Sequence, residues 1–496
     1  MKERCKELPE ELWESILNRL ALDHDDYRDL RFPSLVCRQF LSITNKIRRK
    51  FVANADVFYI YGCEALCRAL ERFKNLKEME LSLYRAKSDV NYPVLKIAYS
   101  GLDLQSLCFG RFPICPSADT FRRLSSTMNN LKILRCSEFD SLRDIDLVPI
   151  ADAFPRLEEL DIQRNRNMFG PQKVLYPKLS DQFVTDAGIE AMSRNLRGRG
   201  LRSIDISGNY FCSDLSLVAL SSNCVLLNEI KCRRCDITRR GIDWVLSHSP
   251  NLTSLQAEFY GSSRNSAFPF DDTEISATGG SKKKKKMITA TGLRELDIEG
   301  SDDKEGLLRS IAKAGIPLEK LSLCGQLLYQ SHRLTTLLRA FPILKHLKVR
   351  NGYWVNDGNI MIDICRCLPN IEYIELDGCY SLTATTFSVL AKECPALSEI
   401  TLINGYMRDD FVVNLERNYR VVYLDLTYTR GLKDKLLKDI VVACPNLQTL
   451  KVWGCRQLTK EGLEEILKCC PQIKHLTSAK YGEILSKAFN TLPNQN

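Results

Sequence analysis

Apolar residues recur along this chain as trios: one apolar residue, a second one three positions later, and a third one two positions after that. The last two members alternate with polar residues, which predicts a short strand that buries one face and leaves the other in water. The trios return every 24 to 28 positions except across two longer gaps. Their first residues are Leu76, Leu104, Leu131, Leu157, Leu201, Leu227, Leu252, Leu293, Leu318, Leu344, Ile371, Leu397, Val421, Leu447 and Ile473.

A helical pattern follows the trios, as the segments after Thr238 and Thr459 show. Each threonine precedes apolar residues spaced for one helix face and can cap the helix start, and a proline ends each helix. Units of this period are typical of leucine-rich repeats, which stack on their neighbours. Because a helix is wider than a strand, we expect an α/β solenoid shaped as a horseshoe, with parallel strands on its concave side and helices on its convex side.

The two longer gaps, residues 163–200 and 258–292, exceed one repeat and predict surface loops that leave the solenoid. The second gap contains Lys282 to Lys286, five of the nine formal excess positive charges. This run fits a weak nuclear-import signal or an ordinary solvated charge run. We expect the solenoid to span residues 52–482, and residues 483–496 to form a C-terminal cap or a frayed tail.

Composition excludes several classes of protein. The sequence has no uncharged apolar stretch of about 18 residues or more, and its charged N-terminus lacks the apolar run of a signal peptide. We therefore expect a soluble protein of the cytoplasm, the nucleus or both, without a membrane partner. The net charge is +9, and without the five lysines of the lysine run the chain is only mildly basic. This argues against nucleic acid as the main partner.

The sequence also lacks the motifs of an enzyme. Its five histidines are scattered, and no HExxH, GxSxG or glycine-rich phosphate loop occurs. Cys232 and Cys235 form a lone CxxC pair, and Cys232 is itself the third member of a trio. We interpret both cysteines as core residues rather than as metal ligands or a redox pair. We expect no catalytic residue, no metal and no cofactor.

Residues 6–51 lack the trio spacing and predict three short helices instead. A module of about 45 residues can hardly bury so many apolar side chains alone, so some should face the first repeats or a partner. One interpretation is a module that only caps the end of the solenoid, and the other is a docking surface. The apolar positions of the three helices are Leu12, Ile16 and Leu20, then Leu30, then Leu35, Val36, Phe40, Ile43 and Ile47.

Three segments of this module resemble an F-box, the motif that docks on the Skp-type adaptor of cullin-RING ubiquitin ligases. The segments are Leu8-Pro9-Glu10-Glu11-Leu12, Ile16-Leu17-Asn18-Arg19-Leu20 and Ser34-Leu35-Val36-Cys37-Arg38-Gln39-Phe40. With the repeats behind them, the chain is similar to F-box/leucine-rich-repeat proteins, most of all those of plants.

The resemblance implies a substrate-recognition subunit of an SCF-type ubiquitin ligase. Such a subunit binds a Skp-type adaptor, and through it a cullin, and holds a target protein for ubiquitination by its partners. The residues that the resemblance divides between the adaptor surface and the core of the module are Leu8, Pro9, Leu12, Ile16, Leu20, Leu35, Val36 and Phe40.

The concave face is the expected place for a target protein, because the variable residues of each strand point into solvent there. Tyrosine, tryptophan and arginine are enriched at binding hot spots, although aromatic residues at strand edges also pack on the next repeat. The expected substrate-binding residues are Lys348, Arg350, Tyr373, Tyr423, Lys451 and Trp453.

Two other functions fit the same sequence. One is a repeat scaffold without a ubiquitin role, and the other is a small-molecule, hormone-like receptor of the same build. The receptor ranks lower, because Glu375 and Asp425 interrupt the basic residues of the concave face.

Overall fold

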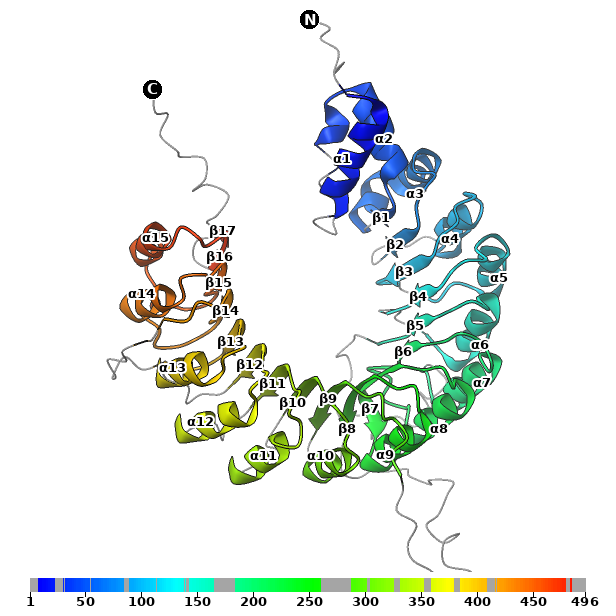
Figure 1. Ribbon diagram of the computed structural model, residues 1–496. Helices are drawn as coiled ribbons and strands as arrows, with labels where there is room; N and C mark the ends of the chain where they lie inside the picture. The colour runs from blue at the N-terminus through cyan, green and yellow to red at the C-terminus, as the bar shows by residue number, and fades with distance from the viewer. Residues whose placement is uncertain are drawn as a thin grey trace, which may run out of the picture. The chain divides into compact units, whose positions relative to one another are not determined.

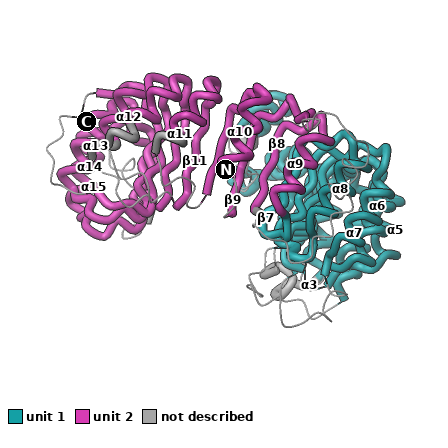
Figure 2. The backbone as a smooth tube through the Cα atoms, turned by 90° about the horizontal axis from the view of Figure 1, so that it is seen from below, with its two compact units in different colours: residues 1–237, 264–277 teal, residues 238–263, 278–496 magenta. Residues whose placement is uncertain are grey.

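The computed structural model of the chain is an array of strands that alternate with helices (Figure 1). Its residues form two compact units, which divide after Ile237 (Figure 2). The structure describes residues 8–22, 30, 32–53, 55–83, 89–112, 114–137, 139, 142–164, 183–259, 287–300, 304–324, 331–351, 358–378, 384–407, 415, 417–478 and 482–483.

The first unit begins with helices and continues with strands, each paired in parallel with the next from β1 to β7. Its elements are α1 Glu10–Leu22, the 3-10 helix η2 Pro33–Leu35, α2 Arg38–Ile47, β1 Lys50–Ala53, α3 Ala55–Arg72, β2 Glu78–Ser82, α4 Asn91–Ala98, β3 Ser106–Gly110, α5 Ala118–Thr127, β4 Ile133–Arg135, α6 Asp144–Ala153, β5 Glu159–Asp161, α7 Asp186–Asn195, β6 Ser203–Asp205, α8 Asp214–Asn223 and β7 Glu229–Ile237.

The second unit repeats the same plan, with parallel pairing from β8 to β16 and a final antiparallel pair between β16 and β17. Its elements are α9 Arg239–His248, β8 Ser254–Phe259, β9 Glu295–Gly300, α10 Lys304–Lys313, β10 Lys320–Cys324, α11 Ser331–Leu338, β11 His346–Arg350, α12 Gly358–Cys367, β12 Tyr373–Asp377, α13 Ala384–Glu393, β13 Glu399–Ile403, β14 Tyr423–Asp425, α14 Asp434–Ala443, β15 Thr449–Lys451, α15 Lys460–Cys469, β16 His475–Ser478 and β17 Gly482–Glu483.

The apolar trios place the strands. Each strand from β2 to β16 begins two residues after the first member of a trio, as β15 at Thr449 follows Leu447. The first members are all buried, with no more than 2% of their surface exposed. Burying one such leucine stabilises the fold by roughly 1.5–3 kcal/mol, so the trios form the core between strands and helices. The predicted α/β leucine-rich-repeat solenoid is confirmed.

The predicted helix caps are also present. The side chain of Thr238 accepts a hydrogen bond from the amide of Arg240 at 3.2 Å, at the start of α9. The side chain of Thr459 accepts one from the amide of Gly462 at 3.0 Å, at the start of α15. These bonds satisfy amide groups that a helix start otherwise leaves without a partner.

The capping threonines Thr185 and Thr459 also bond to the preceding repeat. Asp144, the first residue of α6, accepts hydrogen bonds from the amide and hydroxyl of Thr185 at 2.7 and 2.6 Å. Asp434, the first residue of α14, accepts the same two bonds from Thr459 at 2.9 and 2.6 Å. The aspartate of one repeat therefore fixes the helix start of the next repeat.

This joint explains the glycine that follows each capping threonine by three positions. A Cβ on Gly462 would overlap the carboxylate of Asp434, and a Cβ on Gly188 would overlap that of Asp144. At these two joints the carboxylate occupies the space of a side chain, so glycine fits there without displacing it. Ser216 stands at the same position after the capping residue Ser213, and there its hydroxyl donates to the carboxylate of Asp186.

Several boundaries differ from those expected. The first expected loop, residues 163–200, contains the regular repeat helix α7, which buries Ile189 and Met192. Its cap Thr185 and the apolar spacing after it are those of an ordinary repeat. Strand β1, which no trio precedes, starts the sheet at Lys50 inside the expected helical module. Of the expected loops, residues 165–182 and 260–286, with the lysine run, lie outside the described residues.

Two further expectations concern the cysteine pair and the C-terminal end. Cys232 and Cys235 are both buried, as expected for core residues, and the thiol of Cys235 donates to the carbonyl of Ile206 at 3.2 Å. At the C-terminal end, β17 pairs with β16 across the expected end of the solenoid at residue 482, and residues 484–496 lie outside the described residues.

The joint between α14 and α15 gives a first prediction. Gly462→Ala should lower the free energy of unfolding by about 2 kcal/mol, because the added methyl group displaces Asp434 from its two hydrogen bonds with Thr459. Gly200→Ala is the control, since a Cβ there has no atom within 4 Å. Denaturant unfolding of both variants measures the difference.

A double-mutant cycle tests the cause of this loss. In an Asp434→Ala background the carboxylate is gone, so Gly462→Ala should cost less than half of what it costs in the native chain. An equal cost in both backgrounds would contradict the proposed contact.

Candidate functional site

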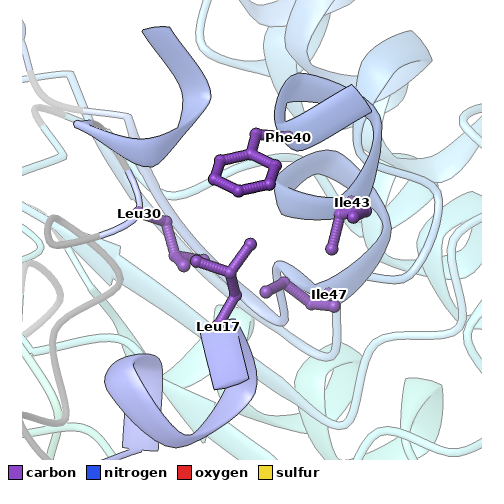
Figure 3. Close-up of a cluster of buried hydrophobic side chains, with 5 residues drawn as sticks. All are labelled: Leu17, Leu30, Phe40, Ile43 and Ile47. Atoms are coloured by element: carbon purple, nitrogen blue, oxygen red, sulfur yellow. The ribbon is translucent and has the colours of Figure 1, made fainter. Parts of the chain in front are cut away.

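The helices before the solenoid have a core of their own. Leu17 of α1, Leu30, and Phe40, Ile43 and Ile47 of α2 form one buried cluster (Figure 3). The ring of Trp13 packs against that of Phe40, with 4.8 Å between the ring centroids. An ion pair of 2.6 Å between Lys46 and Glu14 also joins the two helices. We call α1, η2 and α2 with this core the helical module.

One side of the helical module is fixed to the first repeat. The carbonyl of Arg49, just after α2, accepts hydrogen bonds from the amides of Lys77 and Glu78 at 2.7 and 2.9 Å. The guanidinium of Arg72 in α3 donates to the side chain of Asn45 in α2 at 2.7 Å. Strand β1 then follows α2 directly and pairs with β2. The end of α2 is therefore bonded to the first repeat.

Other parts of the helical module expose apolar side chains. On α1, Leu12 and Ile16 lie one helical turn apart on one face, and 49% and 41% of their surfaces are exposed. Around η2, the exposed fractions of Phe32 and Leu35 are 74% and 76%. We name the whole set the N-terminal apolar surface. Its members are Leu8, Leu12, Ile16, Phe32, Leu35 and Val36.

The structure separates the expected adaptor residues into groups. Leu8, Pro9, Leu12, Ile16, Leu35 and Val36 are exposed. Phe40 instead lies in the core of the module, because α2 turns it toward Leu17 and Leu30. Leu20 belongs to α1, but its side chain lies outside the described residues.

Phe32 was missed by the sequence interpretation. It precedes Pro33 and belongs to none of the helical stripes, so the periodicity gives no sign of its exposure. The one available signal is its position, an aromatic residue directly before the proline that starts η2.

The strand face of the second unit holds the expected substrate-binding residues in registered pairs. Lys348 of β11 lies opposite Glu375 of β12, and their side chains form an ion pair of 3.1 Å. The hydroxyl of Tyr373 donates to the same carboxylate at 2.5 Å, and the Lys348 ammonium lies 5.2 Å from the centroid of the Tyr373 ring. Burial raises the pKa of Tyr373, and its bond to Glu375 adds to the increase.

Arg350 is engaged on the other side, toward β9. Its guanidinium pairs with Asp297 at 3.2 Å and with Glu299 at 2.5 Å, and it donates to the hydroxyl of Ser322 at 3.2 Å. The guanidinium is thus held by two carboxylates within the sheet. A partner that used this charge would have to break those bonds.

A second pair lies on β14 and β15. The Lys451 ammonium lies 5.2 Å from the centroid of the Tyr423 ring, and the Tyr423 hydroxyl donates to Asp425 at 3.3 Å. Trp453 follows Lys451 on the same side of the chain and is 45% exposed. The structure therefore joins Lys348 with Tyr373, and Lys451 with Tyr423, whereas Arg350 contacts neither pair.

The ion pairs of the strand face bear on the alternative function, a small-molecule receptor. A basic pocket for an anion needs cations that are not already neutralised. Lys348 and Arg350 both contact carboxylates, so the strand face of the second unit has mixed charge, which suits protein contacts better than a phosphate group.

The strand face of the first unit contains a row of charged residues. Arg135, Asp161, Asp205 and Lys231 lie opposite one another on β4 to β7. Burial raises the pKa of Asp161 to about 6, and the nearby charge of Asp205 adds to the increase, against the hydrogen bond from the amide of Gln163. Burial also raises the pKa of Asp205.

Within the described ranges, no group of three histidine, cysteine, aspartate or glutamate residues is placed to hold a metal ion. No helix in those ranges combines the length and the apolar run that a membrane span requires.

Comparisons with known proteins give a weak sequence match. No known family profile matches the chain. It is 24% identical over 136 residues to F-box/LRR-repeat protein 4 from Bos taurus, a match that covers 27% of this chain and 22% of that relative. The match thus spans less than a quarter of the relative's length. It supports a similarity to F-box/LRR proteins.

Two solved structures match the chain with low scores. The complex of Rad7 and Elc1 from yeast matches with a TM-score of 0.46 and 17% identity, over 91% of this chain and 95% of that chain. The leucine-rich-repeat protein LegL7 from Legionella pneumophila matches with a TM-score of 0.34 and 12% identity, over 82% and 92% of the two chains.

The raised pKa of Asp161 predicts a pH-dependent stability. The carboxyl group of Asp161 keeps its proton up to a higher pH in the folded chain than in the unfolded chain. The stability that this difference contributes is complete below about pH 4 and is lost as the pH rises through 6. Asp161→Asn keeps an oxygen for the Gln163 amide but carries no charge. The difference in unfolding free energy between Asp161→Asn and the native chain should therefore shift in favour of the variant by about 2 kcal/mol between pH 4.5 and pH 7.5.

Denaturant unfolding at the two pH values measures this difference. Asp119→Asn, a substitution on the exposed surface of α5, serves as the control and should show no such gain. The same pH dependence in the native chain and in Asp161→Asn would show that Asp161 is not the group responsible.

Proposed function

We propose that this chain is the substrate-recognition subunit of an SCF-type ubiquitin ligase. The N-terminal apolar surface would dock on a Skp-type adaptor, and the strand face of the solenoid would hold a target protein. The observation that carries the proposal is the exposure of six apolar side chains on a helical module that has a core of its own and bonds to the first repeat.

A module that only capped the solenoid would need a polar outer surface. Leu35 and Phe32 instead expose about three quarters of their surfaces. Apolar area left in water forgoes about 25 cal/mol for each Å² that a partner could bury. A cluster of such residues on a small module is typical of a protein-binding surface. Capping explains the attachment of α2 to the first repeat, and docking explains the exposed side chains.

The expected mode of docking is insertion of apolar side chains into a groove of the adaptor. Leu12 and Ile16 offer one helical face, and Phe32, Leu35 and Val36 offer side chains from the turn around η2. In such interfaces a few buried anchors contribute most of the binding energy. The chain itself would supply binding and proximity, while its partners would perform the transfer of ubiquitin.

A scaffold without a ubiquitin role would use the same surfaces for other partners. It differs from the proposal in one respect, since its N-terminal apolar surface would not bind a Skp-type adaptor. The choice between the two functions therefore depends on adaptor binding.

Co-purification of the full chain with a Skp-type adaptor tests the proposal. The triple variant Leu12→Ala, Ile16→Ala, Leu35→Ala removes three exposed side chains without touching the core of the module. We expect it to lose at least about 100-fold in adaptor affinity, since each anchor contributes more than about 1 kcal/mol. Its thermal unfolding should match that of the native chain.

The control changes exposed apolar residues elsewhere. Val225→Ala with Leu226→Ala removes two exposed side chains between α8 and β7 and should leave adaptor binding unchanged. Adaptor binding retained by the triple variant would exclude the N-terminal apolar surface as the docking site. No adaptor binding by the native chain would favour the scaffold.

A further inference from the structure

Three exposed aromatic residues follow successive strands of the second unit. Tyr406 follows β13, Tyr428 follows β14 and Trp453 follows β15, and 41%, 53% and 45% of their surfaces are exposed. We call them the aromatic ridge. Tyrosine and tryptophan offer a large contact area and are enriched among residues that dominate binding energy. Tyr428 and Trp453 are neighbours, because the amide of Tyr428 donates to the carbonyl of Trp453, whereas Tyr406 lies opposite Arg430.

Tyr428 has an unusual backbone conformation. Its φ of +55° lies in the left-handed region, which tyrosine rarely adopts. By the register of the parallel strands, the same position in the neighbouring turns holds Asn351, Gly378, Asn404 and Gly454, all with positive φ. Glycine and asparagine tolerate this conformation best. Within the described residues of the second unit, the other residues at this position are glycine or asparagine, and Tyr428 is the exception. In the first unit, Arg111 and Arg234 also have a positive φ.

The surrounding backbone holds Tyr428 in place. Its amide donates to the carbonyl of Trp453 at 2.6 Å, and the amide of Arg430 donates to the carbonyl of Gly405 at 3.0 Å. A Cβ on Gly454 would overlap the ring of Tyr428, so the ring lies directly on the glycine backbone of the next turn. A strained residue that its neighbours fix in position is a pattern found at ligand-binding sites.

Basic residues follow Tyr428 and Trp453, in segments bounded by Asp425, Asp434 and Glu461. Residues 426–433 and 452–460 contain four arginines and lysines and no acidic residue. Arg430 and Arg456 are both exposed and follow Tyr428 and Trp453 by two and three positions. Aromatic surface flanked by guanidinium groups is complementary to carboxylates next to an apolar side chain.

We propose that the aromatic ridge binds an acidic peptide segment of the target protein. An apolar or aromatic side chain of the peptide packs on Tyr428 and Trp453, and its carboxylates pair with Arg430 and Arg456. This inference rests on the proposed function, because it names the class of target segment that the second unit would hold. Tyr428 is retained in its strained conformation because the ring contributes to binding.

Selection of random displayed peptides on the immobilised full chain tests the inference. We expect the recovered peptides to be rich in aspartate and glutamate around an apolar residue. A labelled recovered peptide should bind at least roughly tenfold more weakly to Tyr428→Asn and to Trp453→Ala. It should also lose affinity when its acidic residues are replaced by their amides, or when the salt concentration is raised.

Tyr428→Asn separates binding from folding. Asparagine already occupies this position in two neighbouring turns, so the melting temperature of the variant should equal or exceed that of the native chain. Tyr419→Asn changes an exposed tyrosine that precedes β14 instead of following it, and should leave peptide affinity unchanged. Recovery of no acidic peptides, or equal affinity of Tyr428→Asn and the native chain, would overturn the inference.

The outcome is independent of adaptor binding, which the ridge variants should retain. Loss of peptide binding with adaptor capture intact is the expected result for Tyr428→Asn. Adaptor capture without any effect of the ridge variants on peptide binding would reject the ridge alone. Failure of adaptor capture in the native chain would instead reject the proposed function.

Discussion

Parallel backbone hydrogen bonds between the strands of successive repeats determine the positions of all other features in each unit. Each strand adds to the last in a fixed register, so equivalent residues of neighbouring repeats lie beside one another. The register brings Lys348 beside Glu375, and Asp425 beside Lys451. It also aligns the residues of positive φ that end the strands. A short apolar trio, repeated, thus produces a surface of ordered side-chain rows.

A stack of this kind has a first strand, and its exposed edge has to be covered. The helical module precedes this strand, and the end of α2 is bonded to the first repeat. Its other face has no such structural task and exposes Leu12, Ile16 and Leu35. The same module can therefore cap the solenoid and present a docking surface. The second unit offers a different surface, in which ion pairs order the strand face and the aromatic ridge stays exposed.

The sequence predicted the solenoid well because the trio depends only on local spacing. It missed β1, since the segment Lys50–Ala53 has no trio before it. Periodicity also could not tell which face of α1 is buried: Leu12, Ile16 and Leu20 form a stripe, yet the core is made by Leu17 and flanked by Trp13. That choice depends on how α1 packs against α2, which is a tertiary contact.

The sequence predicted which strand residues face away from the core but not how their side chains pair. Strand alternation correctly placed Lys348 and Lys451 on the exposed side of the sheet. Arg350, however, reaches Asp297 and Glu299, which are more than fifty positions away in sequence and two strands away in space. The strained backbone of Tyr428 is equally invisible in one sequence, because it becomes unusual only beside Asn404 and Gly454 in the register.

The central claim is that the helical module contacts the first repeat through α2 and a partner through the N-terminal apolar surface. Backbone hydrogen exchange of the full chain, with and without a Skp-type adaptor, tests it most directly. The account predicts new protection in residues 8–22 and 32–36, with no change in β1 and β2. Unchanged exchange in both segments at saturating adaptor, or new protection only in the repeats, would contradict it.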